Sequence, residues 1–247
     1  MNNILIHIPH GSYVIPEKYK FLFYLSEKDL FQEQIKMTDS FTEDLFTVPN
    51  TENIVFPISR LVCDVERFRH EKDEEMTKQG MWVCYTKTSE LKPLKRVNPM
   101  HKAEILKNYY DVHHKKFTEK VKQILEKYRS CLIIDGHSFA SVPLPYELHA
   151  DSFRPDICIG TDKFHTPKYL TEYFYKSFSN LGYKAAINNP FCGTIVPLDF
   201  YGKSKRVKSI MLEINRSLYM NEKTGEKNNN FEKVKNDIQK IITLADF

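Results

Sequence analysis

The segment ILIHIPHGS, residues 4–12, combines a strand-like beginning with a polar ending. The run Ile4–Ile8 is apolar except for His7. A short apolar run bounded by turn-forming residues is typical of a strand buried on both faces. Pro9 ends the run, and His10 is the next polar side chain. It is either a polar residue of an ordinary turn or a functional group held at the end of a strand, and the rest of the sequence must distinguish these.

Similar short runs recur along the chain and alternate with longer helical patterns. We expect further strands at Asn53–Phe56, Leu61–Val65, Cys131–Asp135, Asp156–Gly160, Lys184–Ile187 and Ser209–Asn215. We expect helices at Ser26–Phe46 (broken near Thr38), Pro99–Tyr128, Pro167–Leu181 and Phe231–Leu244. This alternation predicts an α/β fold of three layers, with helices on both faces of a mixed, mostly parallel central sheet. No linker interrupts the pattern, so we expect a single domain over residues 1–247.

The composition is that of an ordinary globular protein. Hydrophobic residues make up 41% of the 247 residues, enough for a large core, and the net charge is only +4. The small lysine clusters at Lys115–Lys116 and Lys203–Lys208 are typical of solvated faces. We therefore expect no nucleic-acid partner.

Cysteine usage and hydropathy bear on the compartment. The chain has five cysteines and no CxxC spacing, which argues against a disulfide framework and for a reducing environment. No apolar stretch approaches the roughly 18 residues that span a bilayer. The N-terminus also lacks the features of a signal peptide. We expect a cytoplasmic protein with no membrane partner.

A second histidine follows a second expected strand. The run Cys131–Ile134 leads into Asp135 and His137, and functional groups of open α/β sheets gather just past the carboxyl ends of strands. Imidazole is the commonest metal ligand, and a nearby carboxylate often fixes its ring. Because a catalytic zinc takes three protein ligands, we add Asp39 to His10 and His137. Capping of a helix N-terminus is the alternative role of Asp39.

Glu213 interrupts the apolar run of the last expected strand. A carboxylate inside a buried strand is costly unless it is paired or functional. Burial raises the pKa of a carboxyl group, which suits a general base that acts on a metal-bound water. A buried salt bridge with Arg216 is the alternative.

The segment SRLVCDVER, residues 59–67, has an arginine near each end of a short apolar run. Arg60 and Arg67 in such positions suit the bidentate capture of a carboxylate. Alternatively, Arg60 pairs with Asp64 and Arg67 pairs with Glu66, so that the charges neutralise one another.

A long loop near residue 193 completes the set of candidates, since loops of this length are often functional. Gly193 allows a ligand to approach the backbone closely, and Tyr201 could offer its hydroxyl to a substrate. His114, on the long expected helix, faces either the site or solvent. Cys192 has no histidine near it in sequence, which argues against a thiol hydrolase. Ser138 lies outside a GxSxG motif, which argues against a serine hydrolase.

Eight stretches of the chain occur in the order seen in one known family. They are PHGS, TDSFTEDLF, SRLVCDVERF, YYDVHHKKF, IIDGHSF, DICIGTD, the Gly193 loop and LEINRSLYM, from His10 to Met220. In these stretches the chain resembles the N-formylglutamate amidohydrolase family, which is similar to zinc carboxypeptidases and aspartoacylase-like deacylases. The resemblance implies a zinc-carboxypeptidase-like α/β fold with a mixed sheet, one zinc ion and a glutamate base on a late strand.

The resemblance also implies roles for individual residues. His10, Asp39 and His137 match the zinc ligands, and Glu213 matches the catalytic glutamate. The arginines that resemble carboxylate-binding groups are Arg60, Arg67 and Arg216, and we assign oxyanion stabilisation to Arg67.

Two departures from the family pattern stand close to these residues. PHGS replaces the commoner PHSG, and Glu66–Arg67 replaces the commoner Asn-Arg. The negative charge of Glu66 beside a carboxylate-binding arginine is expected to affect the choice of substrate.

The predicted reaction is hydrolysis of the amide bond of a small N-acyl amino acid such as N-formylglutamate. A zinc-activated water would attack the amide, with Glu213 as general base. Another divalent metal could replace zinc. The alternatives are a carboxypeptidase-like enzyme, another N-acyl-amino-acid deacylase, and a non-catalytic carboxylate-binding protein on the same fold.

Overall fold

The structure, a computed structural model, describes residues 3–148 and 153–245. Its central feature is a six-stranded sheet in the order β2-β1-β3-β6-β4-β5. The strands are β1 (Ile4–Ile8), β2 (Glu52–Val55), β3 (Cys131–Phe139), β4 (Ile157–Gly160), β5 (Ala185–Ile187) and β6 (Val207–Asn215). The first four strands in this order are parallel, whereas β4 pairs antiparallel with β6 and parallel with β5. The predicted mixed, mostly parallel sheet is confirmed.

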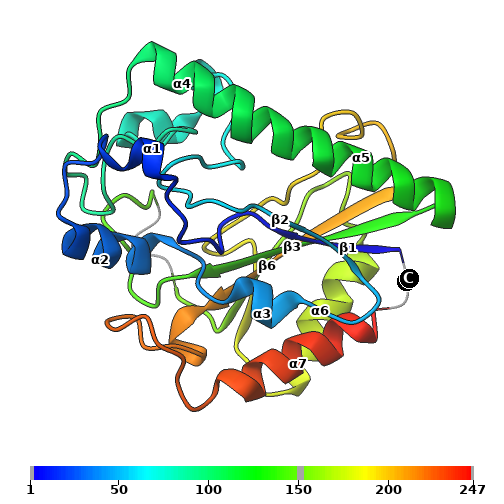
Figure 1. The fold of residues 1–247 in the computed structure, drawn as a ribbon. Coiled ribbons are helices and arrows are strands. Elements are labelled where there is room, and N and C mark those ends of the chain that lie inside the picture. Colours follow the sequence, from blue (N-terminus) through cyan, green and yellow to red (C-terminus); the bar gives the residue numbers. More distant parts are fainter. Residues whose placement is uncertain (1–2, 149–152, 246–247) are drawn as a thin grey trace.

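Helices cover both faces of the sheet (Figure 1). α5 lies on one face, and α3, α6 and α7 lie on the other, whereas α4 precedes α5 and packs its Ile105 in a separate cluster. The α-helices are α1 (Glu17–Lys20), α2 (Glu27–Met37), α3 (Thr42–Phe46), α4 (Pro99–Ile105), α5 (Asp111–Tyr128), α6 (Lys168–Asn180) and α7 (Phe231–Thr243). Short helical turns are formed by Glu71–Asp73, Glu75–Gln79 and Arg216–Leu218, and a π-helical turn, Leu106–Tyr110, joins α4 to α5. The three predicted layers are therefore present.

Alternation along the strands divides the core between the two faces. Ile4, Ile6 and Ile8 of β1 pack in one cluster with residues of α3, α6 and α7. Leu5 packs in a second cluster with residues of α5. His7 has the same orientation as Leu5, and its ring stacks on Phe117 of α5 with centroids 4.6 Å apart. The buried His7 ring therefore lies on the α5 face of the sheet.

The strand predicted at Leu61–Val65 is wrong. The segment forms buried turns, in which the amides of Val62 and Cys63 both donate to the Ser59 carbonyl. The buried ammonium group of Lys95 donates to the carbonyls of residues 61 and 62. Because these backbone groups find partners outside a sheet, apolar character alone does not make this segment a strand.

The helical predictions hold with two changes: a π-helical turn, Leu106–Tyr110, interrupts the helix expected at Pro99–Tyr128, and Asp39 does not cap a helix. The expected break near Thr38 is present, because α2 ends at Met37 and α3 begins at Thr42. Asp39 does not cap α3, since the residue before Thr42 is Phe41 and no side chain caps that helix. Within the described residues, no helix is both long and apolar enough to cross a membrane.

Candidate active site

Strand register brings two of the predicted site residues together. His137 of β3 lies directly opposite Glu213 of β6, and His7 of β1 lies opposite Asp135 of β3. All four side chains are buried or nearly so, and alternation directs them to the α5 face. His10 follows β1 by two residues and reaches the same region, where its ring lies 5.2 Å from that of His137.

The three residues predicted as metal ligands converge. His10, Asp39 and His137 are buried, and each offers a ligand atom within 4.8 Å of the other two. The Asp39 Oδ2 atom lies 3.0 Å from His137 Nδ1 and 3.6 Å from His10 Nδ1. With metal–ligand bonds of about 2.1 Å, one ion can reach atoms with these separations.

The orientation of the His10 ring also suits a metal. Its Nε2 atom is hydrogen-bonded to Asp64 Oδ1 at 2.9 Å, whereas its buried Nδ1 atom has no hydrogen-bond partner. When Nε2–H donates this hydrogen bond to the carboxylate, the proton stays on Nε2 and the Nδ1 lone pair is free to bind a cation. The donor set of two imidazoles and a carboxylate is one that zinc accepts.

Asp64 is itself held firmly. It accepts hydrogen bonds from Arg60 Nη2 at 2.9 Å and from the Tyr85 hydroxyl at 2.5 Å. Burial alone would raise the pKa of Asp64, but the charges of His10, Arg60 and Arg67 outweigh burial and hold it well below its usual range. Asp64 is therefore a fixed anion behind the His10 ring.

Glu213 is the buried carboxyl group that the sequence singled out. Burial raises its pKa to about 7, and the nearby charge of His137 opposes this only in part. Its Oε2 atom is buried without a hydrogen-bond partner. The alternative salt bridge is not formed, because Arg216 lies 3.4 Å from Asp39 and donates to Ser138 and to the Lys36 carbonyl.

Glu66 lies between the predicted metal ligands and a second group of polar residues. Its Oε2 atom is 3.1 Å from His137 Nε2 and 3.8 Å from His10 Nδ1, and its Oε1 atom is 3.7 Å from His7 Nδ1. Glu66, His7 and Asp135 again offer ligand atoms within 4.8 Å of one another. Of the two predicted neutralising pairs, only Arg60–Asp64 occurs at close range.

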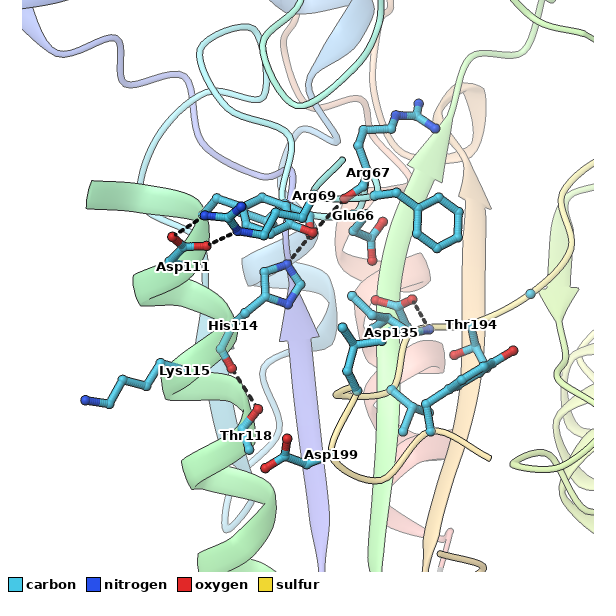
Figure 2. A pocket seen from close by; sticks show the side chains of 18 of the residues that line it. Glu66, Arg67, Arg69, Asp111, His114, Lys115, Thr118, Asp135, Thr194 and Asp199 are labelled. Carbon is cyan, nitrogen blue, oxygen red and sulfur yellow. Dashed lines mark hydrogen bonds and ion pairs between the residues drawn. The ribbon is translucent and has the colours of Figure 1, made fainter. Parts of the chain in front are cut away.

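A cavity of about 870 Å³ opens beside this second group. Its walls come from α5, from residues 65–69 and from the loop around residues 192–201. Figure 2 shows Glu66 and Asp135 projecting toward each other at the cavity wall, while Arg69 and Asp111 form an ion pair on α5's side. The predicted metal ligands do not line the cavity, but Glu66 and Asp135 line it and also lie 3.1 and 3.2 Å from His137 Nε2.

The three predicted carboxylate-binding arginines are placed differently. Arg67 lines the cavity, has a 21% exposed side chain, and has a buried Nε atom without a hydrogen-bond partner. Arg60 and Arg216 are absent from the cavity wall, and both donate to groups within the protein. Of the three predicted arginines, only Arg67 lines the cavity.

The three remaining predicted residues also lie at the cavity. His114 is part of the wall, and its Nε2 atom is hydrogen-bonded to the Val65 carbonyl at 2.8 Å, so it supports the segment that carries Glu66. Gly193 has a φ of 90°, which favours glycine, and an added Cβ would meet open space. Tyr201 is half-exposed at the rim, 3.3 Å from Asp162.

Sequence reasoning underestimated two residues of this region. Asp64 was placed only in a pair with Arg60, although it also orients His10. His113 was passed over for His114, yet His113 Nε2 lies 2.9 Å from His7 Nε2. The signal for His113 was helical spacing, because it shares the buried face of α5 with Phe117, four residues later.

Comparisons with known proteins agree with this architecture. The family model described as N-formylglutamate amidohydrolase matches residues 2–220. The fold resembles the crystal structure of N-formylglutamate amidohydrolase from Ralstonia eutropha JMP134, with a TM-score of 0.81, 18% identity, and coverage of 97% of this chain and 91% of that one. A gene product from Agrobacterium tumefaciens gives a TM-score of 0.64, 17% identity, and coverage of 98% and 91%. A search of curated proteins gave no match.

Proposed function

Because the chain belongs to the N-formylglutamate amidohydrolase family, we propose that it hydrolyses the amide bond of an N-acyl amino acid, with N-formylglutamate as the first substrate to test. The observation that carries the proposal is the convergence of His10, Asp39 and His137 beside the buried carboxyl of Glu213. The five cysteines are all free, which supports a reducing compartment such as the cytoplasm.

We assign a zinc ion to His10, Asp39 and His137. The unpartnered Nδ1 atom of His10 and the Asp39 oxygen that faces both imidazoles support this assignment. Bound zinc supplies Lewis-acid chemistry: it lowers the pKa of a water ligand toward about 7 and polarises a carbonyl oxygen.

Glu213 moves the proton in the proposed reaction. A general base works best when its pKa is close to the working pH, and burial raises the pKa of Glu213 to about 7. We propose that its carboxylate accepts a proton from the attacking water and then delivers that proton to the leaving nitrogen. Strand pairing fixes Glu213 opposite His137, so the base is held beside the metal ligands.

Arg67 and the cavity hold the substrate in this proposal. A guanidinium group can bind a carboxylate through two parallel hydrogen bonds, and Arg67 is one of the residues that line the cavity. The cavity is large enough for a small N-acyl amino acid, since ligand sites commonly measure about 300–1,000 Å³. In this proposal, holding the carboxylate limits the orientations that the substrate can take in the cavity.

A substrate panel tests the proposal directly. Purified protein would be assayed with N-formylglutamate, N-acetylglutamate, a peptide, and an N-formyl amine that lacks the carboxylate. We expect hydrolysis of an N-acyl amino acid, loss of activity after chelation, recovery on adding Zn²⁺, and little turnover of the amine. Absence of turnover on every substrate, with Zn²⁺ or Mn²⁺ supplied, would favour a non-catalytic carboxylate-binding protein.

A further inference from the structure

The carboxylate of Glu66 faces two groups of potential ligands at once. Its Oε2 atom points to the group containing His10 and His137, at 3.8 and 3.1 Å. Its Oε1 atom points to His7 Nδ1, at 3.7 Å, and is buried without a hydrogen-bond partner. A carboxylate with one oxygen toward each of two sites has the arrangement of a bridging metal ligand.

The carboxylates of Glu66 and Asp135 face histidines, whose charge depends on their protonation. Among residues 3–148 and 153–245, Glu66 and Asp135 form ion pairs only with histidines, and with no lysine or arginine. Asp135 is 1% exposed, and buried carboxylates are retained when they are paired or bind a metal. Two negative charges without a fixed cation match the charge of one divalent ion.

A second unpartnered atom points into the same place. His137 is 3% exposed, and its Nε2 atom has no hydrogen-bond partner although it lies 3.1 Å from Glu66 and 3.2 Å from Asp135. His137 Nε2 thus lies between two carboxylates without a hydrogen bond to either, whereas Asp135 Oδ1 is hydrogen-bonded to His7 Nδ1 at 2.8 Å. This observation concerns an imidazole nitrogen, so it is independent of the argument from the charges of Glu66 and Asp135.

The distances fit ligands of a single ion. His7 Nδ1 lies 2.8 Å from Asp135 Oδ1 and 3.7 Å from Glu66 Oε1. If metal–ligand bonds are about 2.1 Å, these separations correspond to angles of roughly 85° and 125° at the metal. The other nitrogen of His7 lies 2.9 Å from His113 Nε2, a partner that can hold the ring in place.

The second group is also accessible. Glu66 and Asp135 form part of the wall of the large cavity, whereas His10 and Asp39 do not. An ion can therefore enter from the cavity without passing through the core. An entry path is one requirement for a workable metal site.

We propose that His7, Glu66 and Asp135 form a second site for a divalent cation that accepts nitrogen and oxygen ligands, such as Zn²⁺ or Mn²⁺. Glu66 bridges this ion and the one assigned to His10, Asp39 and His137. The bridging role rests on the proposed function of the first site. The second site stands on its own geometry, and hydrolases with paired metals hold them about 3.5–4 Å apart.

Metal content tests the second site independently of activity. The protein would be stripped with a chelator, loaded with excess Zn²⁺, desalted, and analysed for zinc per chain by mass spectrometry. We expect two ions for the wild type and one for Glu66→Gln. Glu119→Gln, which removes a carboxylate from the same cavity wall outside either group, is the matched control and should keep two.

The alternative outcomes are distinct. One ion in the wild type, or two ions in Glu66→Gln, would overturn the second site and leave the first intact. No ion in the wild type would overturn both sites. Because a misfolded variant would also lose metal, circular dichroism must match the wild type. Anomalous diffraction from Zn²⁺-soaked wild-type crystals should show two peaks, and a single peak counts against the proposal.

Discussion

The strand half of the candidate site and its loop half are held in place by different interactions. The strand half consists of side chains on β1, β3 and β6, namely His7, Asp135, His137 and Glu213. The loop half consists of side chains between strands, namely His10, Asp39, Asp64, Glu66 and Arg67. Backbone pairing fixes the first set, since His7 lies opposite Asp135 and His137 lies opposite Glu213.

The loop half depends on hydrogen bonds among its own members. The Asp39 amide donates to the His10 carbonyl at 3.0 Å, and the Glu66 amide donates to Asp64 Oδ1 at 3.0 Å. Removal of one member therefore weakens the placement of its neighbours. Substitutions in the strand half should remove one chemical role cleanly, whereas substitutions in the loop half should disturb several.

The largest effect is expected from Glu213→Gln, in the strand half. The amide cannot accept the proton of the attacking water, so kcat should fall on the order of 10²–10⁴-fold. Metal content should be unchanged, because strand pairing continues to hold His137. Steady-state kinetics and metal analysis measure both quantities, with the exposed Glu226→Gln as control. Wild-type turnover would remove Glu213 from the mechanism, and loss of metal would show that the strand half is not independent.

The same division explains what could be predicted from sequence. Apolar runs predicted the strand that carries Glu213 and the first part of the strand that carries His137, because alternation follows from local pattern. The expected end at Asp135 was wrong, since β3 continues to Phe139 and includes His137. Local pattern carries no information on which residues, distant in sequence, supply the hydrogen-bond partners of a loop. Leu61–Val65 was therefore mistaken for a strand, and Arg216 was not expected to lie beside Asp39, 177 residues away.

The position of Glu66 could not be predicted for the same reason. Its sequence neighbour Arg67 suggested a local ion pair, but Glu66 lies against histidines that come from β1, from the turn after β1, and from β3. Only the folded arrangement of three segments creates that environment. Asp64 is similar, because its role behind His10 joins residues that are 54 positions apart.

The loop half is tested most strongly by Asp64→Asn. Loss of the carboxylate behind a histidine ligand typically weakens metal binding 10–100-fold, and we expect that loss here. Competition with a chelating dye measures the affinity of the stripped protein for Zn²⁺. Asp111→Asn, which breaks only an exposed pair with Arg69, should bind Zn²⁺ as the wild type does. Equal affinities for the two variants would mean that Asp64 does not orient His10.

The pH dependence of stability gives a smaller effect in the strand half. In metal-free protein, burial raises the pKa of Glu213 to about 7, above the usual value of 4.5 for a glutamate. The folded state thus holds this proton more tightly, and the resulting stabilisation is lost as pH rises through about 7. Between pH 5 and 8, the free energy of unfolding of the wild type should fall by on the order of 2 kcal/mol more than that of Glu213→Gln.

Urea unfolding of both proteins at the two pH values, in the presence of a chelator, measures this difference. Other titrating groups are common to both proteins and cancel in the comparison. If the free energy of unfolding changes with pH in the same way for both proteins, the pKa of Glu213 is not raised in the folded state.

The smallest effect is expected from Arg67→Lys, at the outer edge of the loop half. Lysine keeps the positive charge but loses the planar pair of donors that grips a carboxylate. We expect KM for the N-acyl amino acid to rise about tenfold, which corresponds to about 1.4 kcal/mol of binding, with a smaller change in kcat. Arg69→Lys is the matched control, because Arg69 lines the same cavity but is already held by Asp111.

The substrate without a carboxylate sharpens this last comparison. If Arg67 grips the carboxylate, Arg67→Lys should not raise KM for the N-formyl amine, because that substrate offers nothing to grip. A KM that rises equally for both substrates would instead point to the ion pair between Arg67 and Asp64, which are 3.5 Å apart. In that case Arg67 would act by holding the loop half together rather than by binding the ligand.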